Sequence, residues 1–332
     1  MIERLRLPAE WEPHAACWLA FPYLEDEWPL HLGAAQASIA ALCRAIAEAG
    51  NEAVRLLVRD QEIEARARSL IGDLANLRYV TSDYGDCWLR DTAPLIGHTA
   101  DGELGALCFE FNGWGGKYET PFDAGVSRWL TGQLRARRFE CPIVLEGGAL
   151  ETNGQGTFLT TASCALNPNR NPGLTRDAFE KALGDRVSIE RLIWLDEGLK
   201  HDHTDGHVDM IARFVGLDTV VCMRSNPSAP NAEALHSIQQ KLHAARLNVV
   251  SLPAAPALRA PNGEPLPASY CNFYIANSAV IVPTYGVPED ETALEELSKA
   301  FAERQVVGLP AADLLRGGGA FHCVTQAEPI RS

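Results

Sequence analysis

The 332-residue sequence lacks several features that would assign it to common protein classes. No apolar run approaches the roughly 18–20 residues of a membrane span, and the N-terminus lacks the apolar segment of a secretory signal. Its nine cysteines include no C-x-x-C pair, which argues against a zinc ribbon or a redox dithiol. Basic residues are the minority, 29 against 43 acidic, which disfavours a nucleic-acid partner. We expect a cytoplasmic protein that binds neither membranes nor nucleic acid.

The composition present is that of a globular protein, with 46% hydrophobic and 22% charged residues. The net charge of −14 favours the approach of cations, although excess Asp and Glu also keep a surface soluble. No low-complexity linker divides the chain, and the proline-rich stretch 253–267 is the best candidate loop, so we expect one domain over residues 1–332. Trp11 and Trp28 would suit a homodimer interface, but core packing explains them equally well.

Short apolar strands outnumber amphipathic helices along the chain. Helical periodicity is clear over residues 33–49 and weaker over 60–71, 122–136, 175–184, 230–245 and 289–303. One or two strands often precede each helix, unlike the strict alternation of a doubly wound sheet. Polar motifs recur at expected strand ends near residues 91, 146, 207, 272 and 323. These patterns predict repeated α/β units around an axis, with the polar loops meeting at one centre.

The densest polar cluster is KHDHTDGHVD at residues 200–209. It resembles the histidine-rich run of binuclear metallohydrolases, with His201, His203 and His207 as zinc ligands, but Gly206 interrupts that pattern. A second interpretation is a solvated polar loop. In a third, His207 and Asp209 alternate on one strand face and point into a cleft as a general acid/base beside a cation-binding carboxylate. The residues alone leave all three open.

Two further motifs place charged groups at expected strand ends. DCWLRDTAP at 86–94 puts Arg90 and Asp91 after Trp88, where a surface ion pair is the ordinary explanation. LEGGALETNGQG at 145–156 puts Glu146 after an apolar strand, followed by two glycines that would let the backbone turn sharply. A carboxylate in apolar surroundings needs a partner, and a histidine is one candidate.

The stretch GGGAFHCVTQ at 317–326 places three glycines just before His322 and Cys323. A phosphate-binding loop would need a helix after the glycines, and the sequence there is not helical. Adjacent side chains on a strand diverge, which makes a metal site from this pair awkward. A core thiol is a fair alternative, but a nucleophile on a short strand, reached through a glycine turn, best explains the flexibility.

Together these motifs resemble the agmatine deiminase and bacterial-type peptidylarginine deiminase family of guanidine-modifying enzymes. The resemblance covers nearly the whole chain and rests on LPAEWEPH (7–14), WLRDTAP (88–94), FNGWGGKY (111–118), EGGALETNGQGTFLTT (146–161), LNPNRNP (166–172), TDGHVD (204–209), SYCNFYIAN (269–277) and GGGAFHCVTQ (317–326). It implies a five-bladed, pseudo-symmetric α/β propeller of the pentein type with the active site at its axis.

The same resemblance implies roles for seven residues. Cys323 would be the nucleophile and His207 the general acid/base, oriented by Glu146. A planar guanidinium can be gripped by paired carboxylates, and the substrate-binding residues implied are Asp91, Asp209, Trp88 and Asn272. The thiolate would depend on nearby cationic charge, from His207 or from the substrate. The reaction would convert agmatine and water to N-carbamoylputrescine and ammonia through a covalent thiouronium intermediate, without a metal or an organic cofactor.

The chain departs from the usual family pattern at several positions. Residues 15–17 are Ala-Ala-Cys where Glu-Gly-Thr is usual, Ala93 replaces a glycine, His203 replaces a glutamate, and Ala320-Phe321 replace Asn-Ile. Several lie near the expected course of the substrate's tail, and we expect Ala320 and Phe321 to influence substrate choice. Another guanidine or peptidyl arginine is therefore an alternative substrate, with an amidinotransferase and the metallohydrolase as further alternatives.

Overall fold

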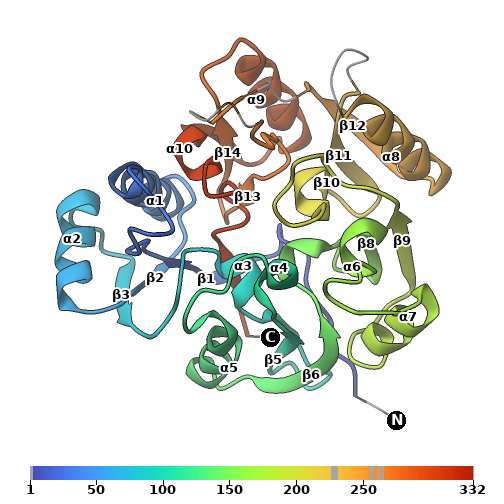
Figure 1. Cartoon of the computed structure of the whole chain (residues 1–332), viewed down its shortest axis with the longest axis horizontal. Coiled ribbons are helices and arrows are strands. Elements are labelled where there is room, and N and C mark those ends of the chain that lie inside the picture. Colours follow the sequence, from blue (N-terminus) through green and yellow to red (C-terminus); the bar gives the residue numbers. More distant parts are fainter. Residues whose placement is uncertain (1–2, 226–230, 255–257, 261–262, 264, 332) are drawn as a thin grey trace.

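Five small β-sheets surround a common centre in the computed structural model, each with its helices on the outside (Figure 1). The structure describes residues 3–225, 231–254, 258–260, 263 and 265–331. Part of the proline-rich stretch 253–267, and the first residue of the helix expected at 230–245, lie outside the described residues.

Four of the sheets share one connection, in which an antiparallel pair is followed by a helix and a parallel third strand. Their strands are β4 (Leu95–His98), β5 (Leu104–Glu110) and β6 (Arg137–Val144); β7 (Leu150–Thr152), β8 (Thr157–Thr161) and β9 (Arg191–Leu195); β10 (Ala212–Phe214), β11 (Thr219–Met223) and β12 (Asn248–Leu252); and β13 (Tyr274–Ile275), β14 (Ala279–Thr284) and β15 (Gln305–Pro310). The corresponding helices are α5 (Asp123–Gln133), α7 (Arg176–Gly184), α8 (Ala232–Ala244) and α9 (Glu289–Ala300).

The fifth sheet joins the two ends of the chain. Its order is β16 (Gln326–Pro329), β1 (His14–Ala20), β2 (Val54–Val58) and β3 (Leu77–Thr81), with α1 (Leu32–Glu48) and α2 (Gln61–Ile71) as crossovers. Strand β16 pairs antiparallel with β1 and so supplies, from the end of the chain, the strand that begins each of the other units. The expected five-unit α/β architecture is confirmed.

The helices form where the sequence provides an apolar face and a start signal. In α1, Ile39, Leu42, Cys43 and Ile46 are fully buried along one face. Helix α2 begins after Asp60, whose side chain accepts a hydrogen bond from the backbone N–H of Ile63. The six helices expected from periodicity all occur, within a few residues at each end.

Short helical turns occupy the centre, where the sequence suggested strand ends. Residues 89–92 form α3 (Leu89–Thr92), and 3₁₀ turns cover η1 (Gly147–Ala149) and η2 (Val208–Met210). The remaining short helices are α4 (Gly113–Gly116), α6 (Ala162–Ala165) and α10 (Ala312–Leu315). These central turns carry the polar motifs.

Trp28 and all nine cysteines lie in the interior of the protein. Trp28 is buried and donates its indole N–H to Asp86, so it is not an exposed interface residue. All nine cysteines are free and buried. Among the described helices, none combines the length and apolar character needed to cross a membrane.

Candidate active site

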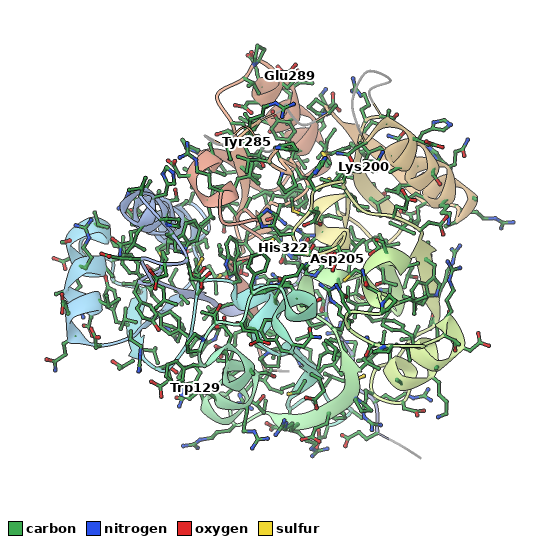
Figure 2. The ribbon with its side chains drawn as sticks, in the orientation of Figure 1. Trp129, Lys200, Asp205, Tyr285, Glu289 and His322 are labelled. Carbon is green, nitrogen blue, oxygen red and sulfur yellow. The ribbon has the colours of Figure 1, made fainter. Side chains whose placement is uncertain are left out.

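A cavity of about 130 Å³ opens beside the central turns. Trp88, Trp114 and Tyr118 provide aromatic walls, and Asp91 and Cys323 also line it. Figure 2 shows the labelled His322, the neighbour of Cys323 in the chain, close to the centre of the molecule, whereas Trp129 lies at the rim. The cavity is therefore at the axis, where the sequence analysis expected the polar loops to meet.

Three side chains converge on a point beside Gly148. A Cβ atom added to Gly148 would lie 2.7 Å from Nδ1 of His207, 2.9 Å from Oδ1 of Asp91 and 3.0 Å from Oδ2 of Asp209. Gly147 packs equally closely, since its Cβ would lie 2.1 Å from the carbonyl oxygen of Arg90. The backbone turns here as expected, in the 3₁₀ turn η1. Neither glycine has a positive φ, so the glycines are needed for close approach.

His207 and Asp209 reach this point from a turn, and the expected alternation on one strand face is wrong. His207 precedes η2 and Asp209 lies within it. The side chains of Asp202 and Thr204 accept hydrogen bonds from the backbone N–H of His207, at 3.1 Å each. Side-chain acceptors at this spacing stabilise a turn in competition with a strand. Gly206, with a φ of +103°, completes the reversal.

Cys323 also lies in a turn, not on the expected short strand, and Asn272 holds that turn in place. Asn272 donates its Nδ2 to the Cys323 sulfur at 3.1 Å, and its Oδ1 accepts from the backbone N–H of Ala320 at 3.1 Å. The sulfur lies 3.7 Å from Oδ2 of Asp209. A Cβ on Gly319 would lie 2.8 Å from that sulfur. The glycine run therefore lets the backbone pass directly beside the thiol.

A buried ion-pair chain orients His207. Its Nε2 lies 3.2 Å from Oε2 of Glu146, which confirms the histidine partner expected for that carboxylate. Arg170 donates its Nε to both carboxylate oxygens of Glu146 at 2.9 Å. With Nε2 held in this way, the Nδ1 atom of His207 faces Asp91, 3.7 Å from its Oδ1.

Burial and neighbouring charges move the pKa values of the central carboxylates in opposite directions. Burial raises the pKa of Asp91 to about 6, and the nearby negative charges of Asp209 and Glu146 add to this effect. Burial also acts to raise the pKa of Asp209, but the hydrogen bond and positive charge of His322 outweigh it and leave the pKa below its usual value. Asp91 is thus the carboxylate that gains a proton first on acidification.

The imidazole and the thiol are shifted strongly as well. Burial opposes the charged form of His207, but the negative charge of Asp91 and the hydrogen bond with Glu146 raise its pKa well above the ordinary value. Burial, together with the negative charges of Asp209 and Asp91, raises the pKa of the Cys323 thiol well above its ordinary value. Both shifts favour the charged form of the imidazole and the neutral form of the thiol in the free protein.

The histidine-rich metal site is not formed. His201 is exposed, His203 stacks on Tyr118 and lines the cavity, and only His207 is fully buried. Within the described part of the chain, the group able to share an ion is Glu146, Cys164 and His207, with ligand atoms within 4.8 Å of one another. Arg170 already neutralises Glu146 there, so this donor set is a poor fit for a cation.

The positions at which the sequence departs from the family pattern differ in whether they line the cavity. His203 lines the cavity, whereas Ala320 and Phe321 are fully buried and do not line it. The influence of this pair on substrate choice stays a prediction. Trp88 lines the cavity wall, and a Cβ on Gly317 would overlap its ring and that of Trp28.

Sequence reasoning missed several residues around the site. Trp114, within the FNGWGGKY motif, donates its indole N–H to Oδ2 of Asp91 at 2.8 Å. Arg170, within LNPNRNP, supports Glu146. From the sequence, His322 had no role beyond an awkward metal pair with Cys323, but its Nδ1 lies 2.7 Å from Oδ2 of Asp209. Trp114 and Arg170 stand in motifs that the sequence shows, but only folding brings them to Asp91 and Glu146.

Comparison with known proteins identifies the family of the chain. The family model for the Porphyromonas-type peptidyl-arginine deiminase matches residues 6–329. The agmatine deiminase of Pseudomonas syringae pv. syringae is 36% identical over 97% of this chain and 95% of its own length. A Cys-to-Ser agmatine deiminase from C. jejuni with substrate bound superposes with a TM-score of 0.91 at 28% identity, over 99% of this chain and 97% of that one. For the agmatine deiminase of Enterococcus faecalis the TM-score is 0.91 at 28% identity, over 99% and 96%. The chain belongs to the Porphyromonas-type peptidyl-arginine deiminase family.

Proposed function

We propose that the protein is a cysteine-dependent guanidine deiminase that hydrolyses agmatine to N-carbamoylputrescine and ammonia. The observation that carries this proposal is the convergence of a thiol, an imidazole and two carboxylates on one buried point. One polar atom of each of two residues in this site, Nδ1 of His207 and Oδ1 of Asp209, is buried and has no hydrogen-bond partner. Buried polar atoms are rarely unpaired, and a guanidinium would supply the missing donors to Asp209.

Asp91 and Asp209 hold the substrate in this proposal. A guanidinium is planar, always charged near neutral pH and able to donate several hydrogen bonds in fixed directions. Its charge also offsets the repulsion between two buried carboxylates. Trp114 and the backbone N–H of Gly148 donate to Asp91 and fix its orientation before substrate arrives. Asn272 fixes the thiol in the same way.

The bound cation would also activate the nucleophile. The carboxylates that raise the pKa of Cys323 are the same two that the guanidinium would neutralise. Substrate binding therefore removes a main reason for the thiol to stay protonated and adds a positive charge beside it. The thiol gives up its proton to solvent when the electrophile is in place, which limits side reactions of the free thiol.

Each half of the reaction moves one proton through His207. The thiolate adds to the guanidinium carbon and forms a C–S bond, and the tetrahedral adduct expels one nitrogen as ammonia. His207 supplies the proton that the leaving nitrogen needs. Water then adds to the thiouronium carbon and gives a proton to His207. Breaking the C–S bond releases the ureido product and restores the thiol.

The cavity favours a small, flexible, cationic substrate. Trp88 and Trp114 can cover the methylene chain of agmatine, and Glu27 and Asp86 provide negative charge for its terminal ammonium. Arg316 lines the same cavity and would attract the carboxylate of free arginine. Free arginine is therefore the first competitor to compare with agmatine.

The test is an ammonia-release screen over agmatine, arginine, short arginyl peptides and substituted guanidines, with mass spectrometry of the ureido product. The proposal expects the highest kcat/KM for agmatine. A preference for arginyl peptides would identify peptidyl arginine, rather than agmatine, as the substrate. If none of the guanidines released ammonia, the proposal would be overturned. Activity abolished by a chelator and restored by zinc would favour the metallohydrolase, and transfer of the amidino group to an added amine would favour an amidinotransferase.

We further propose that residues 1–332 fold as one domain in the cytoplasm, without a nucleic-acid partner. The pairing of β16 with β1 supports cooperative folding, and nine unpaired thiols suit a reducing compartment. Two separate transitions in denaturant unfolding would contradict the single domain. A homodimer stays a prediction, which light scattering can check.

A further inference from the structure

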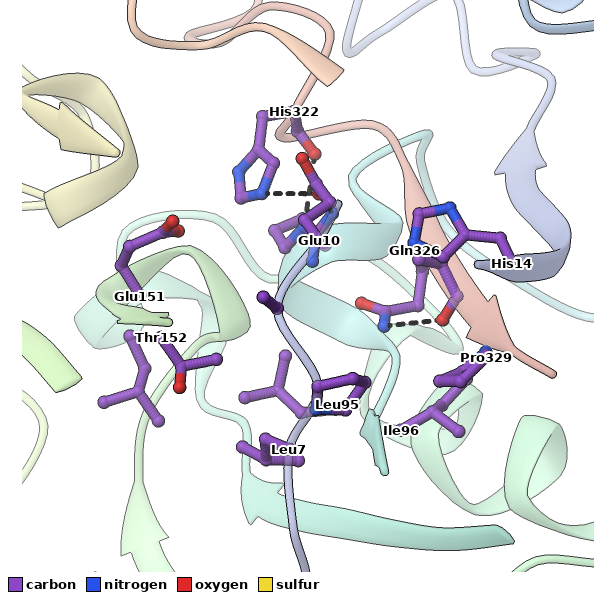
Figure 3. A pocket seen from close by; sticks show the side chains of 15 residues that line it. Leu7, Glu10, His14, Leu95, Ile96, Glu151, Thr152, His322, Gln326 and Pro329 are labelled. Carbon is purple, nitrogen blue, oxygen red and sulfur yellow. Dashed lines mark hydrogen bonds and ion pairs between the residues drawn. The ribbon is translucent and has the colours of Figure 1, made fainter. Parts of the chain in front are cut away.

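Consecutive residues at the end of the glycine run face two different cavities. Cys323 lines the cavity described above, whereas His322 lines a second one of about 60 Å³ together with Glu10 and Arg90. Figure 3 shows this second cavity, with the ion pair between His322 and Glu10 drawn as a dashed line. The side chain of His322 thus lies between the second cavity and the carboxylate that faces the thiol.

Both ring nitrogens of His322 face carboxylates. Nδ1 lies 2.7 Å from Oδ2 of Asp209, and Nε2 lies 3.1 Å from Oε1 of Glu10. Only the doubly protonated ring can donate to two acceptors, because the neutral ring has a single N–H. The side chain is almost fully buried, so water does not readily replace either contact.

Buried charged side chains surround the ring. Glu10 pairs with Arg90 at 2.8 Å and with Arg213 at 2.6 Å. Arg213 also pairs with Glu151 at 2.9 Å. Together with Asp209, these residues carry three negative and two positive charges.

A positive His322 completes the balance of this buried network. A buried charge left uncompensated would be costly. Through Glu10, this network contacts Nε2 of His322, whereas Nδ1 of the same ring contacts Asp209 in the active site.

We propose that His322 is a positioning residue for substrate binding: as an imidazolium anchored on Glu10, it holds Oδ2 of Asp209 and thereby directs Oδ1 toward the guanidinium. This inference rests on the proposed deiminase function. Oδ1 is the atom without a partner, while Oδ2 is occupied by His322 and lies 3.7 Å from the Cys323 sulfur. Without His322, the carboxylate could rotate and offer either oxygen to the thiol.

Two substitutions separate positioning from general support of the fold. In His322→Asn the amide nitrogen takes the place of Nδ1 and can still donate to Asp209. In His322→Gln it takes the place of Nε2 and can donate only to Glu10. We expect His322→Gln to raise KM for agmatine about 10- to 100-fold, as for the loss of one hydrogen bond to a charged group. The effect on kcat should be smaller. His322→Asn should raise KM by only about 2- to 5-fold, which is a third of the His322→Gln effect on a logarithmic scale.

Equal shifts of KM and of the melting temperature in both variants would show a merely structural role and overturn the inference. Unaltered kinetics in His322→Gln would overturn it as well. These outcomes differ from failure of the proposed function, in which the wild-type protein releases no ammonia. If neither variant folds, nitrogen NMR of ¹⁵N-histidine-labelled wild-type protein, with the ring signals assigned to individual histidines, decides: the inference requires both ring nitrogens of His322 to be protonated at neutral pH, and a neutral His322 would refute it.

Discussion

Gly148 provides a direct test of where the guanidinium binds, because it lies among the three groups proposed to handle it. Replacing Gly148 with alanine adds one methyl group. That methyl would lie 2.7 Å from Nδ1 of His207, 2.9 Å from Oδ1 of Asp91 and 3.0 Å from Oδ2 of Asp209. Gly148 does not have a positive φ, so alanine introduces no backbone strain and acts through its side chain.

The magnitude follows from these distances. All three contacts are several tenths of an ångström too short for a methyl group, so the side chains must move or the substrate must sit higher in the cavity. A displacement of about 1 Å from the productive position can cost on the order of 100-fold in rate. We therefore expect kcat/KM for agmatine to fall by at least about 100-fold, which corresponds to about 2.7 kcal/mol of transition-state stabilisation.

The assay is initial-rate ammonia release, with the melting temperature measured on the same samples. Gly132→Ala is the matched control, because nothing lies within 4 Å of its added Cβ and it sits in helix α5. It should retain full activity and gain about 0.5–1 kcal/mol of stability from helix propensity. A Gly148→Ala protein that folds normally and keeps kcat/KM within about threefold of wild type would refute the proposed position of the guanidinium.

Three further predictions concern the charged groups and the thiols. Asp91→Asn should raise KM for agmatine by at least about 10-fold, since it removes one charged hydrogen-bond acceptor. Steady-state kinetics equal to wild type would contradict the proposal that Asp91 holds the guanidinium. Because burial raises the pKa of Asp91 to about 6, and binding needs its ionised form, kcat/KM should fall as the pH drops through 6. A flat profile between pH 5 and about 7 would exclude Asp91 as the titrating group. Cys323→Ala should abolish product formation, whereas Cys164→Ala, which alters a thiol outside the cavity lining, should retain turnover; the reverse result would reassign the nucleophile.

Much of the fold can be predicted from the local periodicity of apolar residues. The apolar face of α1 and the continuous apolar run of β11 are readable because each pattern repeats over a complete element. Strands such as β7 and β16, of three and four residues, were not predicted. They are too short to show a period, and β16 is a strand because it pairs with β1 from the other end of the chain.

The site was predictable only where side-chain chemistry itself was distinctive. Cys323 and His207 stand in recognisable motifs, and the structure brings their neighbourhood together. The turn at His207 was mistaken for a strand because the deciding contacts, from Asp202 and Thr204, are side chain to backbone. Arg170 and His322 support the site through partners at least 24 and 113 residues away in sequence. No local pattern encodes such contacts.

The most direct test of the central claim is acid-quenched mass spectrometry of the protein during agmatine turnover. The mechanism predicts a transient adduct, with the mass of agmatine less ammonia, on the peptide that contains Cys323. It should be missing from Cys323→Ala and present in Cys164→Ala. Hydrolysis that continues in Cys323→Ala, or an adduct found on Cys164, would contradict Cys323 as the nucleophile.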